Sequence, residues 1–251
     1  MTASTALRPE TVPYLDVERL EALDVQVFRS RSPYPWVNPE GLLTPGGYQR
    51  LLDTLPDVKE FTPLFGVTRK HGQQSHDRYA LEYHSGMSVA APWRDFIREL
   101  HGPVYRRFLR RMLDRRLFTL RLHWHYTPSG CSISPHCDSI TKFASHIFYF
   151  NPAADWAPTW GGQTVILDDG GRLKRKSAPQ FEDFDRVITA ETLGNRSLLF
   201  ARGEQSWHGM RDIHCPEHAM RRVFIVVVQD AVRTTARDFV RRLRGQAAET
   251  Y

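Results

Sequence analysis

Hydrophobic and polar residues alternate through much of the second half of the chain. The segment 117–126 (LFTLRLHWHY) has the two-residue period of a β-strand. Turn residues such as Asn-Pro and Gly-Gly separate further apolar runs at 145–151, 164–167, 197–201 and 221–229. Because no helical pattern intervenes, these runs predict an antiparallel sandwich or barrel.

The first half of the chain has helical signals instead. Thr44 and Pro45 suit the N-cap and first-turn positions of a helix that ends before Pro56. A second helix is predicted at 92–100, and a third at 104–112, where apolar residues recur every four positions opposite an arginine-rich face. We expect these helices to be scaffold. Residues 1–40, with three closely spaced prolines, are expected to be irregular; residues 57–90 are a mixed stretch, and a short terminal helix is predicted at 237–244.

The composition is that of an ordinary globular protein, since 41% of the 251 residues are hydrophobic and 25% are charged. No apolar run approaches the roughly 18 residues of a membrane span, and the N-terminus lacks a signal-peptide pattern. The three cysteines form no C-x-x-C pair, which argues against a disulfide framework or a thiolate zinc site. We therefore expect a cytoplasmic protein with no membrane segment.

The net charge of +6 comes largely from arginine clusters. A net positive charge is compatible with a nucleic-acid partner or an anionic substrate. No module that combines aromatic and basic residues occurs, so exposed arginine-rich helix faces are the better interpretation, and a nucleic-acid partner is not expected.

Candidate chemistry begins at His136 and Asp138. On a strand, alternate residues point to one face, so this His-x-Asp pair can bring an imidazole and a carboxylate to one metal ion. A third ligand from a distant strand would complete a facial triad, which is typical of non-haem iron(II) oxygenases. The pair alone is a weak signal, but a strand and a glycine turn precede it and an apolar strand follows it.

The candidates for the third ligand are His146, His208, His214 and His218. His208 follows an apolar strand and a polar turn, so it can return to the mouth of a barrel. His146 lies within a strand-like run and is better explained as a packed or hydrogen-bonded residue. The other two lie in HCPEH, whose proline indicates a loop, and solvent exposure explains them better than zinc binding.

Two arginines begin the last predicted strand, Arg221 and Arg222. Neighbouring strand residues face opposite ways, so one should point inward, where it needs an anion. A guanidinium group pairs with a carboxylate through two hydrogen bonds, and the C5 carboxylate of 2-oxoglutarate is the natural partner.

Over residues 117–230 the sequence resembles the iron(II)/2-oxoglutarate-dependent dioxygenases, and in particular their prolyl-hydroxylase-like branch. The resemblance rests on several pieces that occur in the family's order at family-like spacings. They are Tyr126-x3-Gly130-x5-His136-x-Asp138, IFYFNP at 147–152, Trp156 with WGG at 160–162, NRSLLF at 195–200, SWHG at 206–209, and Arg221.

The resemblance implies an α+β, mainly β fold: a double-stranded β-helix (jelly-roll, cupin-like) core at 117–230 with supporting N-terminal helices. We expect a single oxygenase domain over 1–251, with mixed helical support at 1–116 and a C-terminal helix or tail at 231–251. It implies an iron-binding, catalytic triad and a group of residues for the co-substrate. The triad is His136, Asp138 and His208; the co-substrate group is Arg221, with Arg222 as the alternative, Tyr126 and Tyr149.

The implied activity is hydroxylation of an unactivated C–H bond with Fe(II), 2-oxoglutarate and O₂, forming succinate and CO₂. The carboxylate of Asp138 favours hydroxylation over the halogenation seen in relatives that replace it with a small residue. The absence of an appended recognition domain favours a small-molecule or amino-acid-like substrate. The alternatives are an oxygenase acting on a protein prolyl residue or methylated nucleic acid, and a non-catalytic β-helix binding module.

Overall fold

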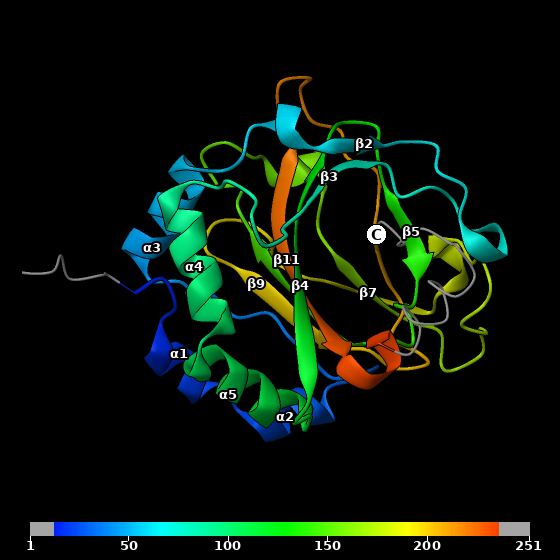
Figure 1. Cartoon of the computed structure of the whole chain (residues 1–251). Helices are drawn as coiled ribbons and strands as arrows, with labels where there is room; N and C mark the ends of the chain where they lie inside the picture. Colours follow the sequence, from blue (N-terminus) through cyan, green and yellow to red (C-terminus); the bar gives the residue numbers. More distant parts are fainter. Residues whose placement is uncertain (1–12, 236–251) are drawn as a thin grey trace, which may run out of the picture.

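The structure, a computed structural model, describes residues 13–235 (Figure 1). The helix predicted at 237–244 lies outside the described residues. Within the described range, no helix is long and apolar enough to cross a membrane.

The helices belong mainly to the first half of the chain, as predicted, but two of them lie at 17–22 and 25–30, where an irregular stretch was expected. Thr44 caps α3, its Oγ1 accepting a hydrogen bond of 3.0 Å from the Gly47 amide. The amphipathic helices α4 and α5 bury aromatic side chains such as Trp93 and Tyr105, which fix them to the sheet. The helices are α1 (Val17–Ala22), α2 (Val25–Ser30), α3 (Pro45–Asp53), α4 (Ala91–His101) and α5 (Pro103–Leu113), with 3₁₀ turns η1 (Val58–Glu60), η2 (Lys70–Gly72), η3 (Pro158–Trp160) and η4 (Phe181–Asp183).

Two antiparallel sheets form the double-stranded β-helix. The larger has the strand order β1-β9-β6-β11-β4-β3-β2, and the smaller the order β5-β10-β7-β8. Figure 1 shows α1 to α5 gathered on one side of the large sheet, away from β5 and β7. The strands of the large sheet are β1 (Trp36–Val37), β2 (Thr62–Leu64), β3 (Arg78–Glu82), β4 (Phe118–Thr127), β6 (Lys142–Tyr149), β9 (Ser197–Ala201) and β11 (Arg221–Asp230). Those of the small sheet are β5 (Ile133–His136), β7 (Val165–Asp168), β8 (Arg186–Thr189) and β10 (His208–Met210).

The alternation of side chains along β11 and β4 separates the helix-packed core from the interior of the β-helix. On β11, Phe224 packs in the core under the helices, whereas Val223 packs between the sheets. On β4, Trp124 belongs to the helix side, while His123 and His125 line the interior cavity. One strand face therefore supports the fold and the other forms the cavity.

The five predicted strands are confirmed as β4, β6, β7, β9 and β11, with small shifts at their ends. The largest shift is in β6, which begins at Lys142 and ends at Tyr149 rather than covering 145–151. Asn151 instead forms an isolated bridge to Leu193 and accepts a hydrogen bond of 2.7 Å from the Arg222 amide through its side chain.

Candidate metal centre

The three predicted metal ligands come together at the open end of the small sheet. His136 is the last residue of β5 and pairs directly with His208, the first residue of β10. Their ring centroids are 4.3 Å apart. Asp138 follows two residues after His136, beyond the end of the strand rather than on it. One ligand atom from each residue lies within 4.8 Å of the others, so the three can share one ion.

Backbone hydrogen bonds fix the tautomer of both histidines. Nδ1 of His136 donates to the Ser134 carbonyl, and Nδ1 of His208 donates to the Ser206 carbonyl, each over 2.9 Å. Because a carbonyl only accepts, Nδ1 carries the proton and Nε2 keeps its lone pair for a metal. Burial lowers the pKa of both rings, which keeps them in the neutral, ligating form.

Asp138 is ionised and held by two side chains. Its Oδ1 accepts a hydrogen bond of 2.7 Å from Lys142 Nζ, and its Oδ2 accepts one of 3.0 Å from Ser145 Oγ. Burial raises the pKa of Asp138, but Lys142 and the two histidines outweigh it and hold that pKa well below its usual range. The triad therefore presents two neutral imidazoles and one carboxylate, a donor set that fits non-haem iron(II).

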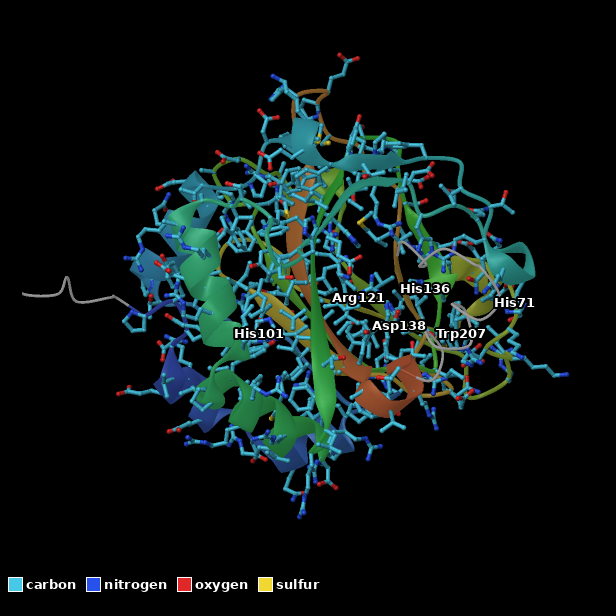
Figure 2. All side chains as sticks on the ribbon, in the orientation of Figure 1. His71, His101, Arg121, His136, Asp138 and Trp207 are labelled. Carbon is cyan, nitrogen blue, oxygen red and sulfur yellow. The ribbon has the colours of Figure 1, made fainter. Side chains whose placement is uncertain are left out.

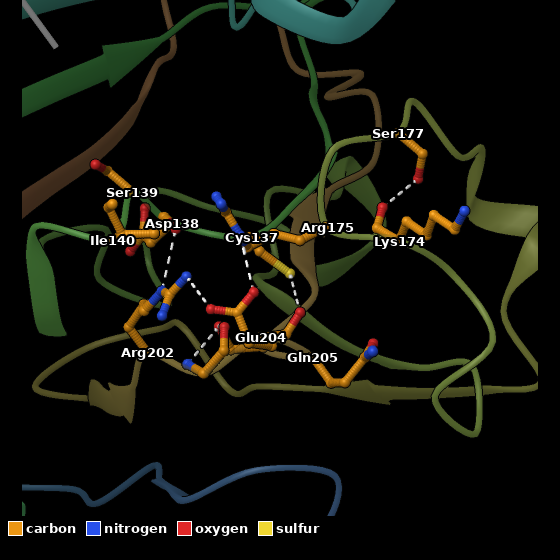
Figure 3. Close-up of polar contacts among 12 residues, drawn as sticks. Cys137, Asp138, Ser139, Ile140, Lys174, Arg175, Ser177, Arg202, Glu204 and Gln205 are labelled. Carbon is orange, nitrogen blue, oxygen red and sulfur yellow. Dashed lines mark hydrogen bonds and ion pairs between the residues drawn. The ribbon is translucent and has the colours of Figure 1, made fainter.

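The loop that carries Asp138 is anchored to the turn before β10 (Figure 3). Arg202 Nε donates to the Asp138 carbonyl over 3.4 Å, and its Nη2 pairs with Glu204 over 2.7 Å. Cys137 Sγ donates to the Glu204 carbonyl over 3.6 Å. These contacts connect the segments that contribute the second and third ligands. Figure 2 places His136 and Asp138 on the β5 side of the molecule, away from the helices.

A cavity of about 600 Å³ extends from the triad into the space between the sheets. Its deeper wall is formed by the interior faces of β4, β6 and β11. These strands contribute His125, Ile147, Arg221 and Ile225, and Thr164 (before β7) and Phe200 (on β9) also line the cavity.

Arg221 is buried in this cavity wall with only 5% of its surface exposed. Its Nε donates to the Gly162 carbonyl over 2.6 Å, and its Nη2 donates to Thr164 Oγ1 over 3.0 Å. The Tyr149 hydroxyl donates to the same Thr164 oxygen over 2.9 Å. Within residues 13–235, no carboxylate lies within ion-pair distance of Arg221. A buried cation with only neutral partners is costly, which favours binding of an anion.

Two further polar atoms near Arg221 are buried without a hydrogen-bond partner. They are His125 Nε2 and Thr127 Oγ1. Thr127 is the strand partner of Arg221, and His125 is the partner of Val223, two residues further along β11. Buried polar atoms are usually hydrogen-bonded, and His125 lines the cavity, so its unpaired Nε2 can hydrogen-bond to a polar ligand there.

The structure separates Arg221 from Arg222. Arg222 points to the opposite face of β11, where its Nη2 lies 3.9 Å from Asp155 Oδ2. Tyr126 is its strand partner and lies on that same face, so it is not part of the cavity wall. The Tyr126 hydroxyl donates to the Pro56 carbonyl over 3.0 Å, and its ring packs on Phe61. Tyr126 therefore packs as a core aromatic and does not line the cavity that contains Arg221.

The other histidine candidates lie outside the triad, as predicted. His146 is fully buried on the helix side of the large sheet, where its Nδ1 shares a hydrogen bond of 2.9 Å with the Tyr105 hydroxyl. His214 and His218 are exposed in a loop.

Several residues around the triad were not predicted. Lys142 could have been found, because it lies four residues after Asp138 at the start of an apolar strand. His76 has no such signal, yet its ring centroid is 4.4 Å from that of His136 and its Nε2 is 3.2 Å from Ser134 Oγ. It comes from the segment 57–90, whose pattern left strands and loops undecided.

No protein-family model matches the sequence, and no curated protein matches it. Solved structures do match. A prolyl-4-hydroxylase from Pseudomonas putida has a TM-score of 0.57 at 15% identity, with 82% of this chain and 97% of that chain covered. A prolyl hydroxylase from Trichoplax adhaerens, in complex with a hypoxia inducible factor peptide fragment, has a TM-score of 0.58 at 15% identity, with 85% and 90% covered. A non-heme α-ketoglutarate-dependent carbocyclase from nogalamycin biosynthesis has a TM-score of 0.56 at 10% identity, with 84% and 86% covered.

This likeness confirms the predicted fold. The chain has the double-stranded β-helix found in prolyl hydroxylases and in non-heme α-ketoglutarate-dependent enzymes of biosynthetic pathways. The neighbours include an enzyme bound to a peptide and an enzyme of small-molecule biosynthesis, so the fold does not select the substrate.

Proposed function

We propose that this protein is an iron(II)- and 2-oxoglutarate-dependent dioxygenase that hydroxylates a small molecule. The observation that carries the proposal is that one cavity is lined by two neutral imidazoles, one carboxylate, and a buried arginine without a carboxylate partner. His136, Asp138 and His208 would hold the metal, and Arg221 would bind the distal carboxylate of 2-oxoglutarate.

Bound iron(II) would supply the activation of O₂ that oxidises a C–H bond, with 2-oxoglutarate converted to succinate and CO₂. The residues of the chain hold and orient the reactants. Thr164 and the Gly162 carbonyl fix the Arg221 guanidinium, and Tyr149 fixes Thr164. Apolar side chains such as Phe200 and Ile225 line the same cavity and exclude water from it.

The size of the cavity supports a small substrate. Its volume of about 600 Å³ lies within the range of small-molecule sites, roughly 300–1,000 Å³. A peptide substrate is the second candidate, because one structural neighbour is a prolyl hydroxylase described in complex with a peptide.

The test is an anaerobic titration of the metal-free protein with iron(II) and 2-oxoglutarate, followed by visible spectroscopy of the metal-to-ligand charge-transfer band. The band should require both additions and should be lost in Asp138→Ala. In Arg221→Ala the dissociation constant of 2-oxoglutarate should rise about 30-fold or more, because losing one partner of a buried charge pair costs roughly 2–5 kcal/mol. Arg222→Ala is the matched control and should bind normally. If wild-type protein gives no band and binds no 2-oxoglutarate, the proposed function is wrong.

A further inference from the structure

The cavity wall around the triad is strongly basic. Among the described residues that line the cavity, Asp138 is the only carboxylate. The basic lining residues, apart from histidines, are Arg69, Lys70, Arg78, Lys142, Arg175 and Arg221. Lys142 pairs with Asp138, and Arg175 pairs with Glu204 over 3.1 Å. The proposed function assigns 2-oxoglutarate to Arg221.

Arg69 and Arg78 have only neutral hydrogen-bond acceptors. Arg69 contacts His76 Nδ1 through Nη1, and its Nη2 donates to Gln73 Oε1 over 3.3 Å. Arg78 Nη1 donates to the His76 carbonyl over 2.6 Å. No carboxylate of residues 13–235 lies within ion-pair distance of either guanidinium. Asp77 is the neighbouring acid, but it accepts hydrogen bonds from the Gly66 amide over 2.8 Å and from the Ser75 hydroxyl.

Arg69 and Arg78 are brought together because both side chains contact the same residue, His76. Burial, together with the charge of Arg69, lowers the pKa of Arg78 to about 10. Burial also lowers the pKa of Arg69. The Nε atoms of both arginines are buried without a hydrogen-bond partner. Two partly desolvated cations side by side are unfavourable, and an anion between them would offset this cost.

The arginine pair lies next to the triad because His76 connects them. His76 contacts Arg69 and Arg78 through its ring nitrogen and its carbonyl, and its ring lies against that of His136. Since Nδ1 of His76 faces a guanidinium donor, it must act as the acceptor, so the ring is neutral.

We propose that Arg69 and Arg78 bind an oxyanion group, a carboxylate or a phosphate, of the primary substrate, which is therefore a small organic anion. This inference rests on the proposed function for the identity of the reaction, but the anion site itself is independent of it. The pair comes from the connection between β2 and β3 and from the start of β3, whereas Arg221 comes from β11. The anionic group would be held at the cavity wall beside His136, and the rest of the substrate would extend toward the metal.

The test uses full-length protein loaded with Mn(II), which is redox-stable and paramagnetic, and with saturating 2-oxoglutarate so that Arg221 is occupied. Benzoate and inorganic phosphate are the carboxylate and phosphate probes, and benzamide is the neutral match for benzoate. Enhanced nuclear relaxation of a probe reports that it binds near the metal. We expect benzoate, phosphate or both to bind, and benzamide not to bind.

Arg69→Gln and Arg78→Gln should each weaken binding of the anionic probe about tenfold, because charge-assisted hydrogen bonds are lost. The affinity for 2-oxoglutarate should stay unchanged. Arg107→Gln, an exposed arginine on α5, is the control for a general loss of positive charge. Arg69→Lys and Arg78→Lys keep the charge and should fall between wild type and the glutamine variants, which separates anion binding from a folding defect.

The outcomes are distinct. Loss of probe binding in both glutamine variants, with normal 2-oxoglutarate binding, supports the proposal, and the probe that binds identifies the oxyanion. Equal binding of the probes to wild type and both variants overturns it, as does failure of both anions to bind loaded wild-type protein. Failure of wild type to bind 2-oxoglutarate would contradict the proposed function instead, and the arginine pair would then be tested in the metal-loaded protein with the Arg221→Ala background.

Discussion

The side chain of Arg221 passes directly beside the backbone of Gly162. A Cβ atom built on Gly162 would lie 3.2 Å from Arg221 Cδ and 3.2 Å from Trp156 Cζ2, and the residue has a φ of +84°. We expect Gly162→Ala to destabilise the protein by about 1–2 kcal/mol through backbone strain and also to weaken 2-oxoglutarate binding by displacing Arg221. Gly170→Ala is the control, because Gly170 has a φ of +62° and a Cβ atom built on it would meet nothing within 4 Å. Thermal unfolding and 2-oxoglutarate titration should show a stability loss in both variants and an affinity loss only in Gly162→Ala.

The hydrogen bond from Tyr149 to Thr164 should affect co-substrate affinity through Arg221. Tyr149→Phe removes a donor to the oxygen that also accepts from Arg221, so we expect 2-oxoglutarate to bind about three- to tenfold more weakly, as for the loss of one net hydrogen bond of roughly 1 kcal/mol. Tyr34→Phe is a matched control, since its buried hydroxyl donates to the Trp207 carbonyl over 2.8 Å. Equal affinities in the two variants would show that Tyr149 has no positioning role.

Lys142 should stabilise the metal-free protein more than the metal-bound protein. Its ion pair with Asp138 is largely buried, with side-chain exposures of 14% and 7%, and removing one partner of such a pair costs roughly 3–5 kcal/mol. A bound divalent cation supplies positive charge to the same carboxylate. We therefore expect Lys142→Met to lower the melting temperature without metal and to increase the shift produced by Mn(II).

A comparison ion pair is available for the lysine experiment. Arg172 and Asp185 lie 2.7 Å apart but are 59% and 67% exposed. Arg172→Met should change stability by less than about 1 kcal/mol with or without metal, because surface pairs contribute little. A Lys142→Met variant that behaves like Arg172→Met would contradict the predicted coupling between Lys142 and the metal.

The buried histidines should make the protein less stable in mild acid. Burial lowers the pKa of His146 to about 3, so the folded state remains unprotonated while the unfolded chain takes up a proton near pH 6.5. Stability from this residue is thus present above about pH 6.5 and is lost as pH falls from there toward 3, at about 1.4 kcal/mol per pH unit. The unfolding free energy, measured with urea between pH 6 and 4, should fall less steeply with decreasing pH in His146→Phe than in wild type. His218→Phe, at an exposed loop position, should leave this dependence of unfolding free energy on pH unchanged.

The sequence predicted the two longest strands closely and missed the shortest ones. β4 and β11 have ten residues each, enough to establish a period, and their ends were predicted to within one residue. β1 has two residues and β10 has three, which is too short for any period to appear. Their pairing depends on tertiary contacts that residue patterns do not record.

In the site too, local sequence patterns could be predicted, whereas features that depend on tertiary contacts could not. The triad could be predicted because the His-x-Asp spacing and the strand-turn-His208 pattern are local. The position of Tyr126 depends on strand register: Tyr126 pairs with Arg222, and Thr127 pairs with Arg221, the arginine that faces the cavity. Alternation within one strand does not reveal which residue of the next strand lies opposite it. Arg69 and His76 could not be predicted because their segment has no periodic pattern.

The two histidines of the triad and Arg221 belong to different sheets, and this has a mechanical consequence. His136 and His208 are on the small sheet, and Arg221 is on β11 of the large sheet. A ligand that joins a metal on the triad to Arg221 would act as a tether between the two halves of the β-helix. Amide hydrogen exchange in β5 and β10 should then slow when metal and 2-oxoglutarate bind together, and less with either one alone.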